Sequence, residues 1–224
     1  MSTRNTKQRR PPAKRGSSRT SQATRQRRIP FVPIAGGVVI VAALFAIFLA
    51  SRSSSSSGGG YPCQVGAPGS GKPAPAVHLT ATNGSTFDLN NERGKTVLLY
   101  FQEGVGCEPC WKQISDIEGQ RASFTAAHVD EIVSITTDPM STLRQKVTDE
   151  HVTIPVFSDP DLSVSRSYNA NRYGMMGTST DGHTFVLVGP DGTIRWRADY
   201  GGEPNYTMYV PVDHLLADLN KGTG

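Results

Sequence analysis

The sequence predicts an α/β domain in which helices cover both faces of a mixed central sheet. The continuous apolar run 96–101 (TVLLYF) is typical of a strand buried on both faces, and 184–188 (TFVLV) is a further predicted strand. Helical segments separate the early strands, which indicates parallel neighbours, whereas a tight turn at 189–192 joins the last two strands. These patterns define a single α/β domain that begins at about residue 76.

The domain opens with a predicted β-hairpin. Residues 77–80 and 86–89 both have strand character, and they flank Asn83-Gly84, a dipeptide that favours a tight hairpin turn. The buried strand 96–101 follows this hairpin.

The segment after the first buried strand is predicted to be a helix that begins at Pro109. Its inward-facing side chains would be Ile114, Ile117 and Phe124. Residues 131–136 (EIVSIT) form the next predicted strand, which completes a first strand–helix–strand unit.

The second half of the domain contains three further predicted helices. We expect Asp138 to cap one with Pro139 at its first position, and Asp159-Pro160 to open a shorter one. After the antiparallel pair 184–188 and 193–198, an amphipathic helix ends the chain, with its apolar stripe at Val212, Leu215, Leu216 and Leu219.

The N-terminal region predicts a membrane anchor. Residues 1–28 carry ten Lys and Arg and no carboxylate, and we expect them to be disordered. Residues 29–50 lack charged side chains and are long enough for one transmembrane helix. Because only Arg52 follows closely, the cation excess predicts a cytoplasmic N-terminus and a domain outside the cytoplasm, at the cell membrane.

A Ser/Gly/Pro-rich linker is predicted over 51–75, so that 76–224 forms the domain. Outside the basic tail, 13 Lys and Arg are outnumbered by 19 Asp and Glu. This mildly acidic composition gives no reason to expect a nucleic-acid partner.

The motif Cys107-Glu108-Pro109-Cys110 carries the predicted chemistry. It stands between the buried strand and a helix, where the helix N-terminus lowers the pKa of a cysteine thiol. Cys107 would be the exposed attacking thiolate and Cys110 the shielded resolving thiol. Pro109 suits the first helical turn, and the charge of Glu108 should raise the thiol pKa.

Other interpretations of the cysteines remain open. The pair could be a structural disulfide or half of a zinc site, although no second pair of ligands at zinc spacing is present. Cys63 could be an inert thiol, an intermolecular partner or a resolving thiol.

The region from about Lys72 to Lys221 resembles the redoxin branch of the thioredoxin superfamily. This branch contains the alkyl hydroperoxide reductase/thiol-specific antioxidant proteins and the membrane-anchored disulfide reductases of cytochrome c maturation. The pieces that carry the resemblance are 79–89, 93–99, CEPC at 107–110, 158–161, 184–188 and 190–192. The resemblance implies a thioredoxin fold and a redox-active Cys107–Cys110 disulfide with no other cofactor.

Three positions depart from the patterns of these families. Gly182 stands where thioredoxin-like proteins usually have a cis-proline and where peroxiredoxins have an arginine. Gly104 stands where peroxiredoxins have a threonine, and Gln113 where some cytochrome-maturation reductases have a glutamate. We expect a trans bond before Gly182 and a more open site, with room for His183 to approach the sulfurs.

Residues 181–192 also resemble the copper-delivery proteins of cytochrome oxidase assembly. That resemblance implies an alternative in which Cys107, Cys110 and His183 bind copper, although that family spaces its cysteines one residue further apart. Otherwise His183 is a loop histidine near the active site. Met175 and Met176 are predicted to pack rather than to bind metal.

Together these features predict a membrane-anchored thiol–disulfide oxidoreductase that acts on protein thiols and disulfides. Its partners would also include the lipid bilayer and a membrane electron donor. A copper-binding assembly factor and a thiol peroxidase are the alternatives.

Overall fold

The computed structural model describes residues 60–223. The predicted tail, membrane span and first part of the linker, 1–59, lie outside the described residues. Within 60–223, no helix combines the length and apolar character needed to cross a membrane.

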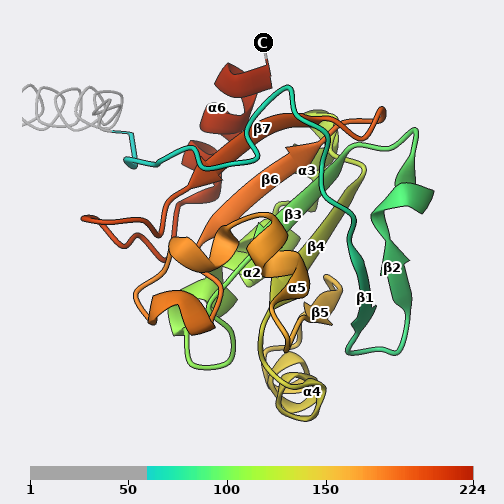
Figure 1. Ribbon diagram of the computed structural model, residues 1–224, viewed down its shortest axis with the longest axis vertical. Helices are drawn as coiled ribbons and strands as arrows, with labels where there is room; N and C mark the ends of the chain where they lie inside the picture. Colours follow the sequence, from blue (N-terminus) through green and yellow to red (C-terminus); the bar gives the residue numbers. More distant parts are fainter. Residues whose placement is uncertain (1–59, 224) are drawn as a thin grey trace, which may run out of the picture. The chain divides into compact units, whose positions relative to one another are not determined.

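A seven-stranded mixed sheet forms the centre of the domain, in the order β2-β1-β5-β4-β3-β6-β7 (Figure 1). Strand β4 pairs in parallel with β3 on one side and with β5 on the other. Strand β1 pairs antiparallel with β5, β6 pairs antiparallel with β3, and β7 pairs antiparallel with β6. The strands are β1 His78–Ala81, β2 Thr86–Asp88, β3 Val97–Phe101, β4 Glu131–Thr136, β5 Val156–Ser158, β6 Thr184–Val188 and β7 Ile194–Asp199. This arrangement confirms the predicted mixed sheet.

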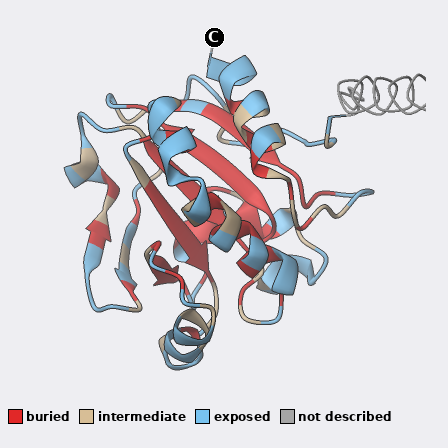
Figure 2. Cartoon of the chain, turned by 180° about the vertical axis from the view of Figure 1, so that it is seen from behind, coloured by how far each residue is buried: buried red, intermediate tan, exposed pale blue. Residues whose placement is uncertain are grey.

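Helices cover both faces of this sheet. In Figure 1, α5 lies in front of the sheet and α2 behind it, and Figure 2 shows that the strands between them are buried. The helices are α2 Glu108–Gly119, α3 Arg121–Ala126, α4 Met140–Asp149, α5 Ser163–Ser167 and α6 Val212–Thr223, with 3-10 turns η1 Leu89–Glu92, η2 Ala170–Arg172 and η3 Gly177–Ser179.

Two apolar clusters fill the spaces on either side of the sheet. The cluster beneath α2 and α6 contains the ring pair Tyr100 and Phe185, stacked with centroids 4.4 Å apart, together with Trp111. The opposite cluster joins the first hairpin to the turn after α5, with Phe101 against Tyr168. Each face therefore excludes water from the backbone of β3, which explains its continuous apolar sequence.

Most predicted elements are confirmed, including the hairpin at Asn83-Gly84, where Gly84 has a φ of +86°. Two helix starts were predicted wrongly. Helix α4 begins at Met140 with Pro139 as its N-cap, and Asp138 makes no capping bond to it. Helix α5 begins at Ser163, although the Asp159 carboxylate still accepts hydrogen bonds at its N-terminus.

The described part of the predicted linker is not free. Residues 60–75 lie along the outer edge of β7, where Gln64 pairs with Asp199 and Pro73 with Thr193. The backbone N–H of Gln64 donates to the carbonyl of Asp199 at 3.0 Å, and the reverse bond is 2.9 Å. The domain therefore begins before the predicted boundary at residue 76.

Candidate functional site

The Cys107–Cys110 pair stands where β3 gives way to α2. Cys107 is the N-cap residue of α2, Cys110 lies in its first turn, and a disulfide joins them. Pro109 occupies the first turn, as predicted. Because the unpaired N–H groups of a helix end face this position, a thiolate at Cys107 is stabilised after reduction.

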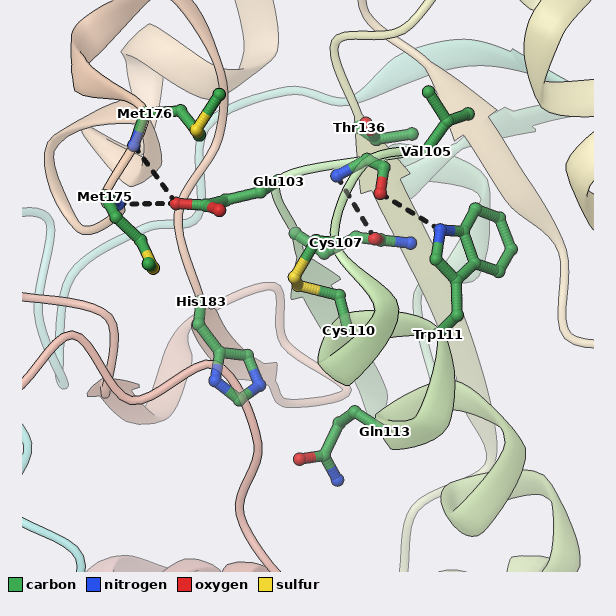
Figure 3. Close-up of a disulfide and its surroundings, with 12 residues drawn as sticks. Glu103, Val105, Cys107, Cys110, Trp111, Gln113, Thr136, Met175, Met176 and His183 are labelled. Carbon is green, nitrogen blue, oxygen red and sulfur yellow. Dashed lines mark hydrogen bonds between the residues drawn. A yellow bond between two sulfur atoms is a disulfide. The ribbon is translucent and has the colours of Figure 1, made fainter.

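The loop between β3 and α2 is held by Asp138 rather than by the helix itself. The Oδ2 atom of Asp138 accepts hydrogen bonds from the backbone N–H of Val105 at 2.7 Å and from the hydroxyl of Thr136 at 3.1 Å. Trp111 donates its indole N–H to the carbonyl of Gly104 at 3.0 Å (Figure 3). These bonds fix the approach of the chain to Cys107 and explain why Asp138 does not cap α4.

The disulfide is covered. Cys107 is 7% exposed and Cys110 is fully buried, and both pack against Met208 with Tyr206 beside it. The predicted order of exposure is therefore correct, but Cys107 is much less accessible than predicted. We call residues 200–210, which carry Met208, the strap.

Hydrogen bonds fasten the strap to α2. The backbone N–H of Val210 donates to the side-chain oxygen of Gln113 at 2.7 Å, and the hydroxyl of Tyr209 donates to Asp116 at 2.5 Å. Gln113, one turn beyond Cys110, is fully buried and therefore links the strap to the helix of the redox pair.

The carboxylate of Glu108 is exposed and turned toward α4. It forms an ion pair with the ammonium of Lys146 at 2.7 Å, and Lys146 also binds Glu150 at 2.6 Å. A neighbouring cation offsets the effect of a carboxylate on thiol ionisation. The sequence did not indicate this partner, because Lys146 is 38 residues away along the chain.

Backbone fills the space around Gly182. A Cβ atom at this position would lie 1.7 Å from the carbonyl oxygen of Tyr173, and the Gly182 N–H donates to the carbonyl of Ala170 at 3.0 Å. The prediction of a more open site is therefore wrong. The expected trans bond is confirmed, because the cis peptide bonds in 60–223 are Ala67–Pro68 and Glu203–Pro204.

His183 lies in the loop that ends immediately before β6, as predicted, and it is fully buried there. Its Nδ1 atom lies 2.6 Å from the carbonyl oxygen of Thr207, and its Nε2 atom has no hydrogen-bond partner. Burial lowers the pKa of His183 to about 4, and the bond to Thr207 opposes this effect. The ring is thus neutral at physiological pH, with Nδ1 protonated and Nε2 an acceptor.

Met175 and Met176 are exposed, so the prediction that they are packing residues is wrong. Their backbone N–H groups donate to the carboxylate of Glu103, which lies in the loop before Cys107 (Figure 3). Glu103 therefore ties the loop 174–179 to the loop that precedes Cys107.

The described residues do not present a preformed ligand set for the copper alternative. Over residues 60–223, no group of three or more His, Cys, Asp or Glu side chains is arranged to hold a metal ion. This includes Cys107, Cys110 and His183, so copper binding stays a prediction without a structural argument of its own.

Cys63 is a free, exposed thiol on the segment beside β7. Partial shielding raises its pKa, and the negative charges of Asp218 and Asp199 raise it further. These effects disfavour the thiolate, so this environment does not activate Cys63 as a nucleophile.

Sequence reasoning missed the residues that cover and position the pair. Asp138 could have been suspected from its place after the end of β4, where side chains meet at the carboxyl edge of the sheet. Met208 and Lys146 carried no such signal, because their contacts depend on how distant segments pack.

Comparison with known proteins places the chain among redoxins. The model of the AhpC/TSA family matches residues 70–197, which is more than half of the chain. A "Putative peroxiredoxin" of Mycobacterium tuberculosis is 33% identical over 130 residues, which cover 55% of this chain and 80% of that protein. The thiol-disulfide oxidoreductase ResA of Bacillus subtilis is 27% identical over 124 residues, or 55% of this chain and 64% of ResA.

Solved structures show the same fold. AhpC of Mycobacterium tuberculosis superposes with a TM-score of 0.57 at 16% identity, over 73% of this chain and 100% of that chain. At this identity the likeness concerns the fold alone.

Proposed function

Because the chain belongs to the AhpC/TSA family and is a thioredoxin-like oxidoreductase, we propose that Cys107 and Cys110 form its redox pair and that its substrates are protein disulfides outside the cytoplasm. The observation that carries this proposal is the disulfide at the N-terminus of α2, with Cys107 more accessible than Cys110. Cys107 attacks a substrate disulfide, and Cys110 then displaces the substrate thiolate.

Trapping the mixed disulfide tests these roles. In a Cys63→Ser background, Cys110→Ser should accumulate covalent complexes with substrate proteins, because the second step is blocked. Cys107→Ser should accumulate none. The measurement is non-reducing electrophoresis followed by release with a reductant. Complexes formed by Cys107→Ser, or wild-type rates of disulfide reduction by that variant, would contradict the assignment.

The outward orientation rests on residues 1–50 and is part of this proposal. The ten cations before the apolar span should hold the N-terminus inside. Protease added to spheroplasts should then remove the domain and leave a protected N-terminal fragment. Protection of the whole domain would contradict the orientation, without bearing on the redox chemistry.

Thiol peroxidase activity is the second candidate, favoured by the peroxiredoxin relative at 33% identity. The site offers it less support. Gly104 has a φ of +94°, and a Cβ there would lie 1.7 Å from Asp138, so the threonine of peroxiredoxins does not fit. Peroxide consumption driven by a dithiol distinguishes the two functions. A rate of peroxide consumption that depends on Cys107 and exceeds the rate of disulfide reduction would favour the peroxidase.

A further inference from the structure

The redox pair is covered at the sulfur that has to react. Thiol–disulfide exchange requires a thiolate to reach a sulfur of the disulfide. Cys110 is fully buried and Cys107 is 7% exposed, so Cys107 is the one that a reagent can approach. Met208 of the strap packs on both cysteines and is itself 7% exposed. The strap therefore shields Cys107 from a protein thiol or disulfide, and this cover has to move in each reaction.

The strap is an irregular segment with hydrogen bonds of its own. It contains neither helix nor strand, and its tip at 203–205 is exposed. The backbone N–H of Tyr206 donates to the carbonyl of Gly202 at 3.1 Å. The backbone N–H of Thr207 donates to the carbonyl of Tyr200, also at 3.1 Å. Because both partners of these bonds lie within the strap, the bonds persist when the strap moves as a unit.

Two side chains of α2 fasten the end of the strap. Gln113 accepts the backbone N–H of Val210 at 2.7 Å, and Asp116 accepts the hydroxyl of Tyr209 at 2.5 Å. Asp116 also pairs with the ammonium of Lys112 at 2.7 Å. Because Lys112 remains with Asp116 on the same helix, release of Tyr209 does not leave the carboxylate without a partner.

The closed strap leaves two buried polar atoms without a hydrogen-bond partner among residues 60–223. They are Nε2 of Gln113 and Nε2 of His183, and both side chains lie below the disulfide in the view of Figure 3. The other polar atom of each side chain holds the strap, at Val210 and at Thr207. Burying a polar group without a partner costs free energy. We expect water to reach both atoms when the strap leaves, which offsets part of the cost of opening.

We propose that the strap is a gate over the redox pair, which opens by releasing α2 and His183 and so gives protein thiols and disulfides access to Cys107. The identity of these substrates rests on the proposed function, whereas the opening itself does not. Gln113, Asp116 and His183 are positioning residues in this scheme, because they act on the reaction through the strap. The closed gate protects the disulfide from reductants, and the open gate exposes it.

Rotation of the Met208 side chain is a smaller movement that would also uncover the pair. Methionine is unbranched and its side-chain bonds rotate easily, so other rotamers are accessible. That rotation leaves the bond between Tyr209 and Asp116 intact, whereas opening of the gate breaks it. Weakening this bond therefore speeds access to Cys107 only if the strap moves as a whole.

Reduction by dithiothreitol tests the gate in the redox state that the structure shows. A reagent thiolate bonds to the Cys107 sulfur while the Cys107–Cys110 bond breaks, and Cys110 leaves as a thiolate. The second reagent thiol then displaces Cys107 and closes the reagent's own disulfide. The reagent is thus oxidised, its two protons pass to the cysteines, and the pair is reduced to two thiols. The rate is measured on the full-length chain with Cys63→Ser, by acid quenching, alkylation and mass spectrometry.

Tyr209→Phe loosens the gate with little change in shape. It removes the hydroxyl that donates to Asp116 and keeps the ring over which the ammonium of Lys112 lies, 5.1 Å from the centroid. We expect the rate of reduction to rise about three- to tenfold, which corresponds to the net contribution of one hydrogen bond to the closed state. An unchanged rate would overturn the inference and would favour rotation of Met208.

Tyr168→Phe is the matched control, because it removes one tyrosine hydroxyl elsewhere in the same domain. The hydroxyl of Tyr168 donates to the carbonyl of Pro75 at 2.7 Å, and its ring packs against Phe101 in the cluster on the opposite face of the sheet. This variant should be reduced at the rate of the parent protein. Equal acceleration in both variants would mean that general loss of stability exposes the pair, and would overturn the inference.

Amide hydrogen exchange of the oxidised protein reports the opening without any variant. The N–H of Val210 should exchange faster than the amides of β3, because opening of the gate releases it without global unfolding. In Tyr209→Phe this exchange should speed up by the same factor as the reduction. Exchange at Val210 that is as slow as in β3 would overturn the inference. Neither measurement uses a protein substrate, so a protein that reduces no protein disulfide would refute the proposed function, while these rates still decide whether the gate opens.

Discussion

Ser165, Asp159 and Asp181 form a hydrogen-bonded set of side chains that should make the free energy of unfolding fall as pH rises. The hydroxyl of Ser165 contacts Asp159 at 2.5 Å and Asp181 at 3.0 Å, and Asp181 is fully buried. A hydroxyl has one proton, so it donates to one carboxyl and accepts from the other. Burial raises the pKa of Asp181 well above its usual range, and the charge of Asp159 adds to this. Asp181 is therefore the protonated member.

Asp181→Asn should remove this pH dependence. Because the pKa of Asp181 is raised on folding, its stabilisation is complete below the unfolded pKa of about 3.9 and is lost as pH rises toward the folded pKa. Over that interval the free energy of unfolding should fall by about 1.4 kcal/mol per pH unit from this group. An asparagine donates to Ser165 at every pH. The free energy of unfolding of the variant, relative to that of the wild type, should therefore increase by about 1.4 kcal/mol per pH unit over the same interval.

Urea unfolding at a series of pH values measures the effect, with the buried Trp111 and Trp196 as fluorescent probes. Asp161→Asn is the control, because Asp161 is exposed and the N–H of Ser163 lowers its pKa. That variant should not gain stability relative to the wild type as pH rises. Parallel curves for the wild type and Asp181→Asn would refute the protonated carboxyl, as would a loss of several kcal/mol in the variant at every pH.

Three further outcomes follow from the geometry of the site. Met208→Ala should cost about 2 kcal/mol of stability, at the low end for a methionine truncation. It should also raise the alkylation rate of reduced Cys107 several-fold, and an unchanged rate would mean that the strap does not shield the pair. Gly104→Thr should destabilise the protein by about 2 kcal/mol or more through its clash with Asp138 and its positive φ, and should not create peroxidase activity; thermal melts and a peroxide assay check this. When the reduced protein is titrated with copper, we expect no stoichiometric binding that depends on His183. Stoichiometric copper binding that is lost in His183→Ala would instead support the copper alternative.

The sequence predicted the elements whose signals are local. The apolar runs of β3 and β6, the Asn83-Gly84 turn and the stripe of α6 all follow from periodicity and turn chemistry. The three-residue strand β5 was missed, because it is too short for either pattern. The CEPC motif could be placed at a helix start for the same local reason.

The environment of the motif could not be predicted, because it depends on contacts between distant segments. The strap that buries Cys107, the pairing of Glu108 with Lys146 and the backbone packed on Gly182 all come from remote parts of the chain. His183 was recognised from its neighbours in sequence, but its burial and its bond to Thr207 were visible only after folding.

The pairing of residues 60–75 with β7 has a practical consequence for preparing the domain without residues 1–59. A strand at the rim of a sheet carries unsatisfied N–H and C=O groups that recruit other chains, and here the segment before β1 satisfies several of them. A recombinant fragment cut at Ala76, where composition alone puts the boundary, would expose Ile194 and Asp199 to edge-to-edge self-association. A fragment that starts at Gly60 keeps these backbone hydrogen bonds at the edge of the sheet and is the better choice for crystallisation and kinetics.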